Sequence, residues 1–394
     1  MARALTLAFL ASIVLVCTIS TAHAQPRIAA LVPRAGGDNA LNSHGWALER
    51  DPDRIVLMSP SKISLHARAK GGLLETGESV VANEHELSYF TIANLGNARF
   101  FLPDTNGTSF AVFEAKREPN PHLERLKDLT FSRKFRQTNG LSNGASVILT
   151  LPSGPLAVFR RVHEVSSVQW NAEARTIESG GKAWDGDQKW HTSPLPSLSA
   201  LCTLGDGEAL VAAQRLDSSE TGRLTIFQAF PDRLEPLTVT TEKQHNEKVR
   251  QGLLLLMSLA SSRDGKLVVG CGGEQATLFE CNEKKELTHR GLYCSAIDKD
   301  NHGWATGIEG LVRPRLCAVG DTCERIAFVD ELGGGVSLCR YDLTTRKLVL
   351  VQAVDLSKLL SDKAGTPIAV TFAGEYLRIS TTRYQLIELD FEKR

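Results

Sequence analysis

The sequence predicts an all-β fold built from a repeated unit of short strands, and three observations support that prediction. Short apolar alternations recur along the chain, turn-forming dipeptides separate them, and 32 glycines suit a chain with many tight turns. The clearest unit is MSLASSRDGKLVVGCGGEQATLFEC at 257–281, where Asp264-Gly265 and Gly272-Gly273 separate three apolar segments. Such dipeptides supply the positive φ that hairpin turns need. This unit is therefore predicted to form strand, turn, strand, turn and strand.

The same order of strands and turns recurs elsewhere in the chain. Strong copies occupy 45–69, 198–230 and 368–391, and weaker copies occupy 87–115 and 143–162. A fourth strand often follows, as KELTHRGLY does after the first unit. The first turns of the copies are predicted near residues 53, 96, 144, 207, 265, 302 and 374.

Four-stranded units of about 40–50 residues are typical of propeller blades. The sequence therefore predicts a single β-propeller over residues 44–394 with about seven four-stranded blades, six or eight being the alternatives. Three polar segments interrupt the repeat and are predicted to be long loop insertions, the first of them with a short helix. These segments are 116–144, 171–197 and 241–250.

Three stretches of the chain resemble known propellers. SRDGKLVVGCGGEQATLFE resembles a blade of the WD-repeat and YVTN-type exported propellers, and VSLCRYDLTTRKLVLV at 336–351 resembles the turn between their third and fourth strands. DKDNHGWATGIEGLVR resembles the blades of periplasmic sensor-kinase propellers at Asp298, Trp304, Gly310, Leu311 and Arg313. The resemblance covers roughly residues 44–394. It implies a fold and not a function, because propellers host many functions.

The first 24 residues are predicted to be a signal peptide. Arg3 precedes the apolar run ALTLAFLASIVLV, and Ala22-His23-Ala24 has the small-x-small pattern of a cleavage site. Cleavage would leave Gln25 as the mature N-terminus, so we expect a secreted or periplasmic protein. A membrane anchor and a lipoprotein signal at Cys17 are the alternatives, although the run is short for a span of about 20 residues.

Residues 25–43 form an N-terminal segment that contains a candidate closing strand. The C-terminal copy ends in YQLIELDFEKR, which reads as a third strand without a fourth. A ring must join its last blade to its first, because otherwise it exposes unpaired strand edges. We therefore expect RIAALV at 27–32 to pair beside 384–391, with a frayed terminus as the alternative. The side chains expected to be buried are Ile28, Leu31 and Val32.

Cleavage would leave seven of the eight cysteines, an odd number that excludes a fully paired monomer. Most of them are expected to be small buried apolar residues. Cys271 and Cys281 lie about five residues apart along the predicted ladder, roughly 17 Å, so no disulfide is expected between them. Cys317 and Cys323 bracket a turn in CAVGDTC and are the local disulfide candidate.

Composition and motifs argue against several classes of function. The chain carries 45 basic and 45 acidic residues, so it has no overall field that would attract nucleic acid or an acidic membrane. No membrane span is expected after signal cleavage. The sequence contains no G-x-S-x-G, no H-E-x-x-H, no C-x-x-C pair and no G-K-[ST] phosphate loop. No catalytic residue is therefore assigned from sequence.

One segment matches part of a calcium-binding loop. In DKDNHGWATGIE, Asp298, Asp300 and Glu309 occupy positions that carry ligands in such loops. His302 occupies a position where an oxygen ligand is needed, so an ordinary turn between strands is the favoured interpretation and a calcium site is the alternative. No cofactor is expected from the sequence, with calcium as the alternative.

A second segment, WDGDQKWH, offers carboxylates and aromatic rings to a ligand. A loop folded onto the edge of a blade is the favoured interpretation, and contact of a sugar or a peptide with the rings and carboxylates is the alternative. The residues concerned are Trp184, Asp185, Asp187 and Trp190.

Two functions are compatible with these observations. The first is an exported, non-catalytic binding or scaffold module for a protein, carbohydrate or other ligand. The second is a propeller enzyme, a hydrolase or lyase acting on sugars, lactones or peptides. Histidines and carboxylates that converge on a concave pocket would favour the enzyme. The histidines placed near predicted turns are His44, His66, His85, His163, His289 and His302.

Overall fold

The computed structural model describes residues 27–33, 45–48, 50–58, 62–68, 74–81, 92–96, 98–103, 110–117, 120–126, 130–131, 146–151, 154–160, 165–171, 176–184, 197–207, 209–216, 221–230, 234–241, 256–330, 334–360, 365–381 and 384–391. The predicted signal peptide lies outside these ranges, as do His44, His85 and His163. No helix within them is long and apolar enough to span a membrane.

Each sheet is one blade, and the blades are numbered in the order of the chain. Blade 1 contains β2 (Gly45–Ala47), β3 (Arg54–Met58), β4 (Lys62–Arg68) and β5 (Leu74–Val81). Blade 2 contains β6 (Ala93–Gly96), β7 (Arg99–Pro103), β8 (Phe110–Lys116) and β9 (His122–Leu126). Blade 3 contains β11 (Ser146–Leu151), β12 (Gly154–Arg160), β13 (Val165–Asn171) and β14 (Thr176–Trp184). Blade 4 contains β15 (Ser197–Leu204), β16 (Ala209–Leu216), β17 (Thr221–Ala229) and β18 (Leu234–Thr241).

Three further blades follow along the chain. Blade 5 contains β19 (Ser258–Ser261), β20 (Leu267–Gly272), β21 (Gln275–Cys281) and β22 (Leu287–Ser295). Blade 6 contains β24 (Leu316–Val319), β25 (Ile326–Val329), β26 (Gly335–Asp342) and β27 (Lys347–Asp355). Blade 7 contains β28 (Pro367–Ala373), β29 (Tyr376–Thr381), β30 (Tyr384–Asp390) and, from the other end of the chain, β1 (Arg27–Pro33).

Short elements extend two of the blades. β10 (Thr130–Phe131) pairs parallel with the outer strand of blade 3, and β23 (Thr306–Ile308) pairs parallel with the outer strand of blade 5. The 3₁₀ helix η5 (Ala296–Asp298) precedes β23, and the short helix α3 (Leu356–Leu359) follows β27.

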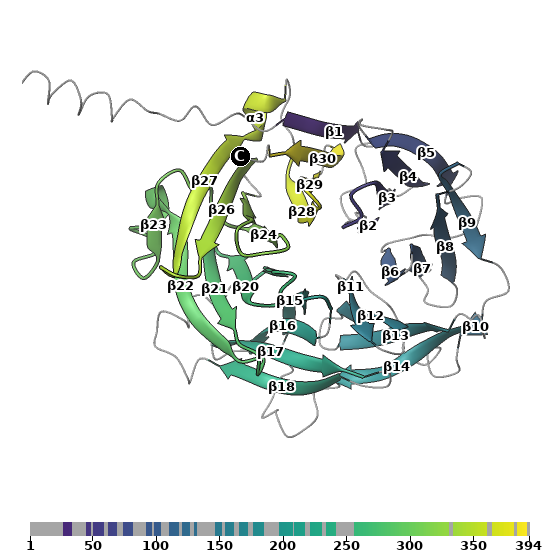
Figure 1. The fold of residues 1–394 in the computed structure, drawn as a ribbon, viewed down its shortest axis with the longest axis horizontal. Coiled ribbons are helices and arrows are strands. Elements are labelled where there is room, and N and C mark those ends of the chain that lie inside the picture. The colour runs from purple at the N-terminus through teal and green to yellow at the C-terminus, as the bar shows by residue number, and fades with distance from the viewer. Residues whose placement is uncertain are drawn as a thin grey trace, which may run out of the picture.

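The described residues thus form seven sheets of mainly antiparallel strands, and Figure 1 shows these sheets arranged around a common centre. Consecutive strands pair in order from the inside of each blade outward. This is the architecture of a seven-bladed β-propeller, as predicted.

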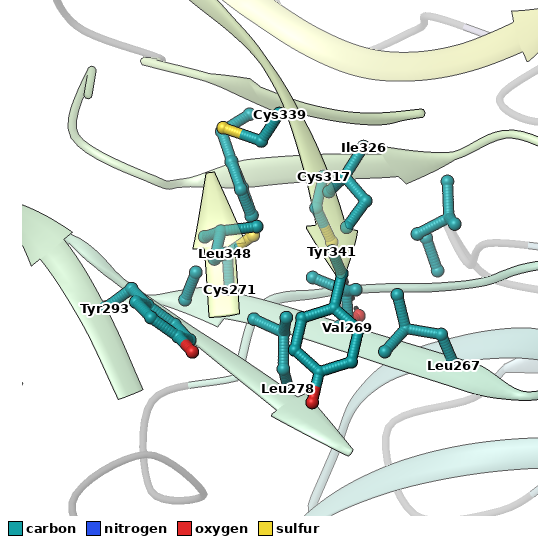
Figure 2. Packing of buried hydrophobic residues seen from close by; sticks show 14 of the residues in the cluster. Leu267, Val269, Cys271, Leu278, Tyr293, Cys317, Ile326, Cys339, Tyr341 and Leu348 are labelled. Carbon is teal, nitrogen blue, oxygen red and sulfur yellow. Dashed lines mark hydrogen bonds between the residues drawn. The ribbon is translucent and has the colours of Figure 1, made fainter. Parts of the chain in front are cut away.

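The hydrophobic core lies between neighbouring blades. All six positions of β20 are buried, because its alternate side chains face two different blades. Val268 packs against blade 4 with Phe279, whereas Val269 and Cys271 pack against blade 6. Figure 2 shows this second interface, where residues of β20 meet Tyr341 and its neighbours. Each large side chain buried in this way contributes about 1.5–3 kcal/mol.

The predicted strand register of blade 5 is confirmed. Cys271 lies opposite Ala276, and the Cys281 amide donates to the carbonyl of Lys266 at 2.8 Å. Cys271 and Cys281 are therefore far apart along the ladder and are not bonded. All seven cysteines of the described residues are buried free thiols, including the disulfide candidates Cys317 and Cys323.

Two of the predicted first turns were wrong. In blade 3, Leu151 at the end of β11 lies opposite Gly154 at the start of β12, so the connection of these strands follows residue 151 and not residue 144. Asn143-Gly144 and Ser153-Gly154 have similar turn chemistry in the sequence, and Gly154 is the first residue of β12. Blade 6 turns at 320–325, whereas residue 302 lies in the connection from η5 to β23.

Two of the predicted loop insertions contain strands. The segment 116–144 forms β9 and β10, and no helix occurs in its described part. The segment 171–197 contains β14, the fourth strand of blade 3. Outer strands need few apolar positions, and in β9 only Leu123 is fully buried. A polar sequence is therefore compatible with such a strand.

The predicted closing strand is confirmed. β1 pairs antiparallel with β30, and Arg27 lies opposite Asp390 and Leu31 opposite Ile387. Figure 1 shows the two strands side by side although they come from opposite ends of the chain. Ile28 is half-buried and packs on the cluster between blades 6 and 7.

A buried ionic network joins blade 7 to blade 1. The side chains of Arg378 and Glu388 are both 0% exposed, and Arg378 Nε donates to Glu388 Oε1 at 2.9 Å. The other Glu388 oxygen accepts from Arg68 Nη2 of blade 1 at 2.7 Å. Arg378 also donates to blade 1 carbonyls, including those of Asp51 at 2.6 Å and Arg54 at 3.2 Å.

Deleting residues 25–33 removes the closing strand and should lower the thermal unfolding midpoint. The deletion leaves one edge of β30 unpaired and exposes apolar surface of blade 7. Each kcal/mol lost lowers the midpoint of a domain of about 350 residues by roughly 1–2 °C. Scanning calorimetry should show a fall of several degrees relative to the chain that starts at Gln25. An unchanged midpoint would mean that β1 does not close the ring.

The Arg378→Met variant should lose about 3–5 kcal/mol of unfolding free energy, because it leaves the buried Glu388 carboxylate with one partner fewer. Arg263→Met is the matched control. Its guanidinium is 65% exposed in a pair with Asp206, so its loss should cost at most about 1 kcal/mol. Denaturant titration of both variants measures the difference in unfolding free energy. Equal losses would show that the buried network between blades 7 and 1 adds no more stability than an exposed ion pair.

Candidate binding site in the central cavity

A cavity of about 680 Å³ lies where the inner strands of six blades converge. This volume is within the range of small-molecule pockets, about 300–1,000 Å³. Each of the six blades contributes residues at or near its first turn, so the local turn chemistry determines the shape of the rim. Rim residues from successive blades are Pro52, Gly96, Gly207, Arg263, Asp321 and Gly374.

Close contact between turns depends on glycine. Gly205 in blade 4 has φ +60° and Gly265 in blade 5 has φ +70°, conformations that other residues rarely adopt. A Cβ atom on Gly205 would lie 3.3 Å from the Arg263 carbonyl oxygen and 3.4 Å from the Gly265 Cα. A Cβ on Gly205 would therefore require the neighbouring backbone to move, whereas one on Gly265 would make ordinary contact, 3.5 Å from the Gly205 Cα.

Arg263 links the turns of three consecutive blades. Its Nε donates to Asp206 Oδ1 of blade 4 at 2.6 Å, and its Nη1 lies 3.9 Å from Asp321 Oδ1 of blade 6. The hydrogen bond that Arg263 donates to Asp206 is the main cause of the raised pKa of Arg263, so the guanidinium stays charged. All three side chains are more than half exposed. Exposed pairs of this kind are weak, so a ligand could compete for them.

Two further arginines line the cavity. Arg99 of blade 2 pairs with Glu114 at 3.2 Å, and Glu114 also accepts from Lys116 at 2.8 Å. Arg50 of blade 1 is exposed and forms no ion pair with a described residue. Burial raises the pKa of the Cys202 thiol in the cavity wall, and the nearby positive charge of Arg50 opposes this shift. Arg50 is therefore the cavity cation that is most available to an anionic ligand.

The described wall carries no activated nucleophile. Ser261 is buried and its hydroxyl donates to the Thr203 carbonyl at 2.5 Å. Burial raises the pKa of the Cys202 thiol, so the thiolate is disfavoured. No histidine occurs among the described residues that line the cavity.

The three candidate calcium ligands lie in different environments. Both oxygens of Asp298 accept from Arg313, at 3.0 Å from Nε and 3.0 Å from Nη2, and Asp298 is buried. Asp300 and Glu309 are exposed. Within the described ranges, no group of three or more histidine, cysteine, aspartate or glutamate residues could hold a metal ion.

The aromatic and acidic ligand candidates are mostly outside the described residues. Trp184 is the last residue of β14, where its backbone lies opposite Val165 of β13. The position of its side chain is not described, and Asp185, Asp187 and Trp190 fall outside the described ranges.

The described histidines lie apart from the cavity. His66 is buried in β4, and His289 packs on Phe279 with a centroid distance of 5.4 Å. His302 Nδ1 lies 2.5 Å from Gln275 Nε2, and its Nε2 lies 3.7 Å from Glu274. The convergence of histidines that would favour an enzyme is therefore not found in the described part of the cavity.

The sequence pattern did not indicate Arg50 and Arg263 as site residues. Their positions in the sequence could have indicated them, because both residues flank correctly predicted first turns, near residues 53 and 265. What the sequence does not show is that those turns face one cavity.

Comparisons with known proteins agree with the fold. No protein-family model matches the chain, and no curated protein matches it. The β-propeller domain of Cps50 (Swd1) from Myceliophteria thermophila is similar over 93% of this chain and 99% of that chain, with 10% identity and a TM-score of 0.53.

Two other solved structures have similar scores. A candidate 6-phosphogluconolactonase from Bacteroides fragilis is similar over 81% of this chain and 86% of that chain, with 12% identity and a TM-score of 0.51. Sqt1 from Saccharomyces cerevisiae is similar over 90% of this chain and 83% of that chain, with 11% identity and a TM-score of 0.50. At these identities the similarity concerns the fold alone. The chain is a β-propeller.

The Gly205→Ala variant should be destabilised more than Gly334→Ala. Both glycines have positive φ, +60° and +66°, so both substitutions cost about 1–2 kcal/mol of backbone strain. Only the Cβ at position 205 meets backbone atoms, whereas nothing lies within 4 Å of one at position 334. Denaturant midpoints of the two variants test this, and equal midpoints would show that the turns of blades 4 and 5 do not pack closely.

Proposed function

We propose that the protein is an exported, non-catalytic binding module whose ligand occupies the central cavity. The observation that carries the proposal is the combination of a ligand-sized cavity with polar groups that are already paired or unreactive. Arg263, Asp206 and Asp321 form exposed ion pairs, Ser261 donates to the backbone, and burial disfavours the Cys202 thiolate. Such groups can hydrogen-bond to a ligand, but none is poised as a base or nucleophile.

The rim favours a polar ligand with both hydrogen-bond donors and acceptors. Guanidinium groups of Arg50 and Arg263 offer donors, and the Asp206 and Asp321 carboxylates offer acceptors. Because these side chains are exposed, a ligand can replace weak ion pairs without leaving a charge buried. A carbohydrate or a protein segment that enters the mouth of the cavity fits this description.

Export is part of the proposal. It rests on the n-region, the apolar run and the small-x-small site in the first 24 residues. The working protein would then begin at Gln25 and act in a periplasm or outside the cell.

Glycan and peptide arrays probed with the mature chain test the proposal. We expect binding to a subset of probes, and at least a tenfold loss of affinity when Arg50 and Arg263 are both replaced by alanine. That loss corresponds to about 1.4 kcal/mol or more. Arg346→Ala is the matched control, because Arg346 is 59% exposed and lies on the turn between β26 and β27, outside the cavity. Binding that survives the double substitution would place the site elsewhere.

The alternative is a hydrolase or lyase, and chromogenic lactones, glycosides and peptides test it. The proposal predicts no turnover above that of buffer. Turnover that is lost in the Arg50 and Arg263 double variant, but kept in Arg346→Ala, would overturn the non-catalytic assignment.

A further inference from the structure

Two of the buried thiols lie next to each other across the interface between blades 5 and 6. Cys271 is on β20 and Cys317 is on β24, and both are in the cluster that fills this interface. Figure 2 shows both residues in that cluster, with Val269 and Tyr341 close by. They are 0% and 3% exposed.

Ser258 lies opposite Cys271 and contacts Cys317, so its position places the two cysteines near each other. It lies directly opposite Cys271 in the β19–β20 ladder, so the two side chains are on the same face of blade 5. Ser258 Oγ accepts from the Cys317 amide at 3.2 Å and lies 3.6 Å from Cys317 Sγ. Cys317 Sγ also lies 3.5 Å from the carbonyl oxygen of Val269, two residues before Cys271. The Cys317 sulfur thus sits on the strand that carries Cys271.

We propose that Cys271 and Cys317 are a site of covalent modification, where a disulfide can join blade 5 to blade 6. The pairing candidate suggested by sequence spacing, Cys317 with Cys323, is a poorer match to the fold. Cys323 lies in the turn after β24, where its carbonyl accepts from the Tyr341 amide at 2.8 Å. The Cys317 sulfur, by contrast, contacts Ser258 and Val269 of blade 5.

The chemistry requires a disulfide oxidant, such as oxidised glutathione or a disulfide oxidoreductase of an exporting compartment. One cysteine thiolate attacks the oxidant, forms a mixed disulfide and releases one thiol. The second cysteine thiolate then attacks the mixed disulfide, which forms the Cys271–Cys317 bond and releases the second thiol. Two protons leave with the two electrons that the cysteines lose.

Burial determines when this reaction can occur. Burial, with a hydrogen bond to Cys317, raises the pKa of the Cys271 thiol, so the folded protein disfavours the thiolate. Neither sulfur is open to a bulky oxidant in the folded blades. We therefore expect the bond to form while blades 5 and 6 fold together, before the interface closes.

Refolding of the mature chain in a glutathione redox buffer tests the inference and does not depend on export. After free thiols are alkylated, digestion without reductant should release a peptide pair that links Cys271 to Cys317. Alkylation of both residues, or a link from Cys317 to Cys323, would overturn the inference.

Thermal unfolding provides a second readout. The refolded wild type should unfold at a higher temperature without reductant than with it. This difference should vanish in Cys271→Ala and Cys317→Ala, but remain in Cys339→Ala, a matched control at a buried thiol of the same cluster. A difference that survives in Cys271→Ala would contradict the proposed pairing.

Discussion

The structure depends on one fully buried guanidinium group at the interface between the last blade and the first. Arg378 is on the second strand of the last blade, and its acceptors are Glu388 of that blade and the carbonyls of a turn in the first blade. Opening the ring would leave this charge without its blade 1 acceptors. The free-energy cost would be larger than that of breaking an exposed ion pair. Because β1 covers the strand that holds Glu388, the N-terminal segment and the ionic network close the same seam.

The contacts that join the blades also shape the candidate site. Arginines bridge neighbouring blades at several seams of the described structure, and most of them bind a first turn. These turns form the rim of the cavity, so the site is a product of ring assembly and no single blade contains it. The bridges run from Arg54 to Ala115, from Arg263 to Asp206, from Arg325 to Gly374 and from Arg378 to Asp51.

Sequence alone predicts most of this fold, because each blade repeats one local pattern. Alternation and Asp-Gly turns locate blade 5, and an unpartnered apolar run locates the closing strand. The pattern fails where two turns are chemically alike, as at residues 144 and 153. It also fails for Arg378, which alternates with Leu377 and Ile379 and so resembles a solvent-facing position. β29 packs against neighbouring blades on both faces, so five of its six positions are buried. The site residues meet only after six blades have assembled.

Native-state hydrogen exchange of the Arg378→Met variant tests the seam most directly. If the buried network holds the ring closed, amides of β1, β30 and β3 should lose protection together, while those of β20 and β21 keep theirs, since local opening frees only the blades at the seam. A uniform loss across all blades, or a loss confined to blade 7, would show that the buried network does not hold blades 7 and 1 together.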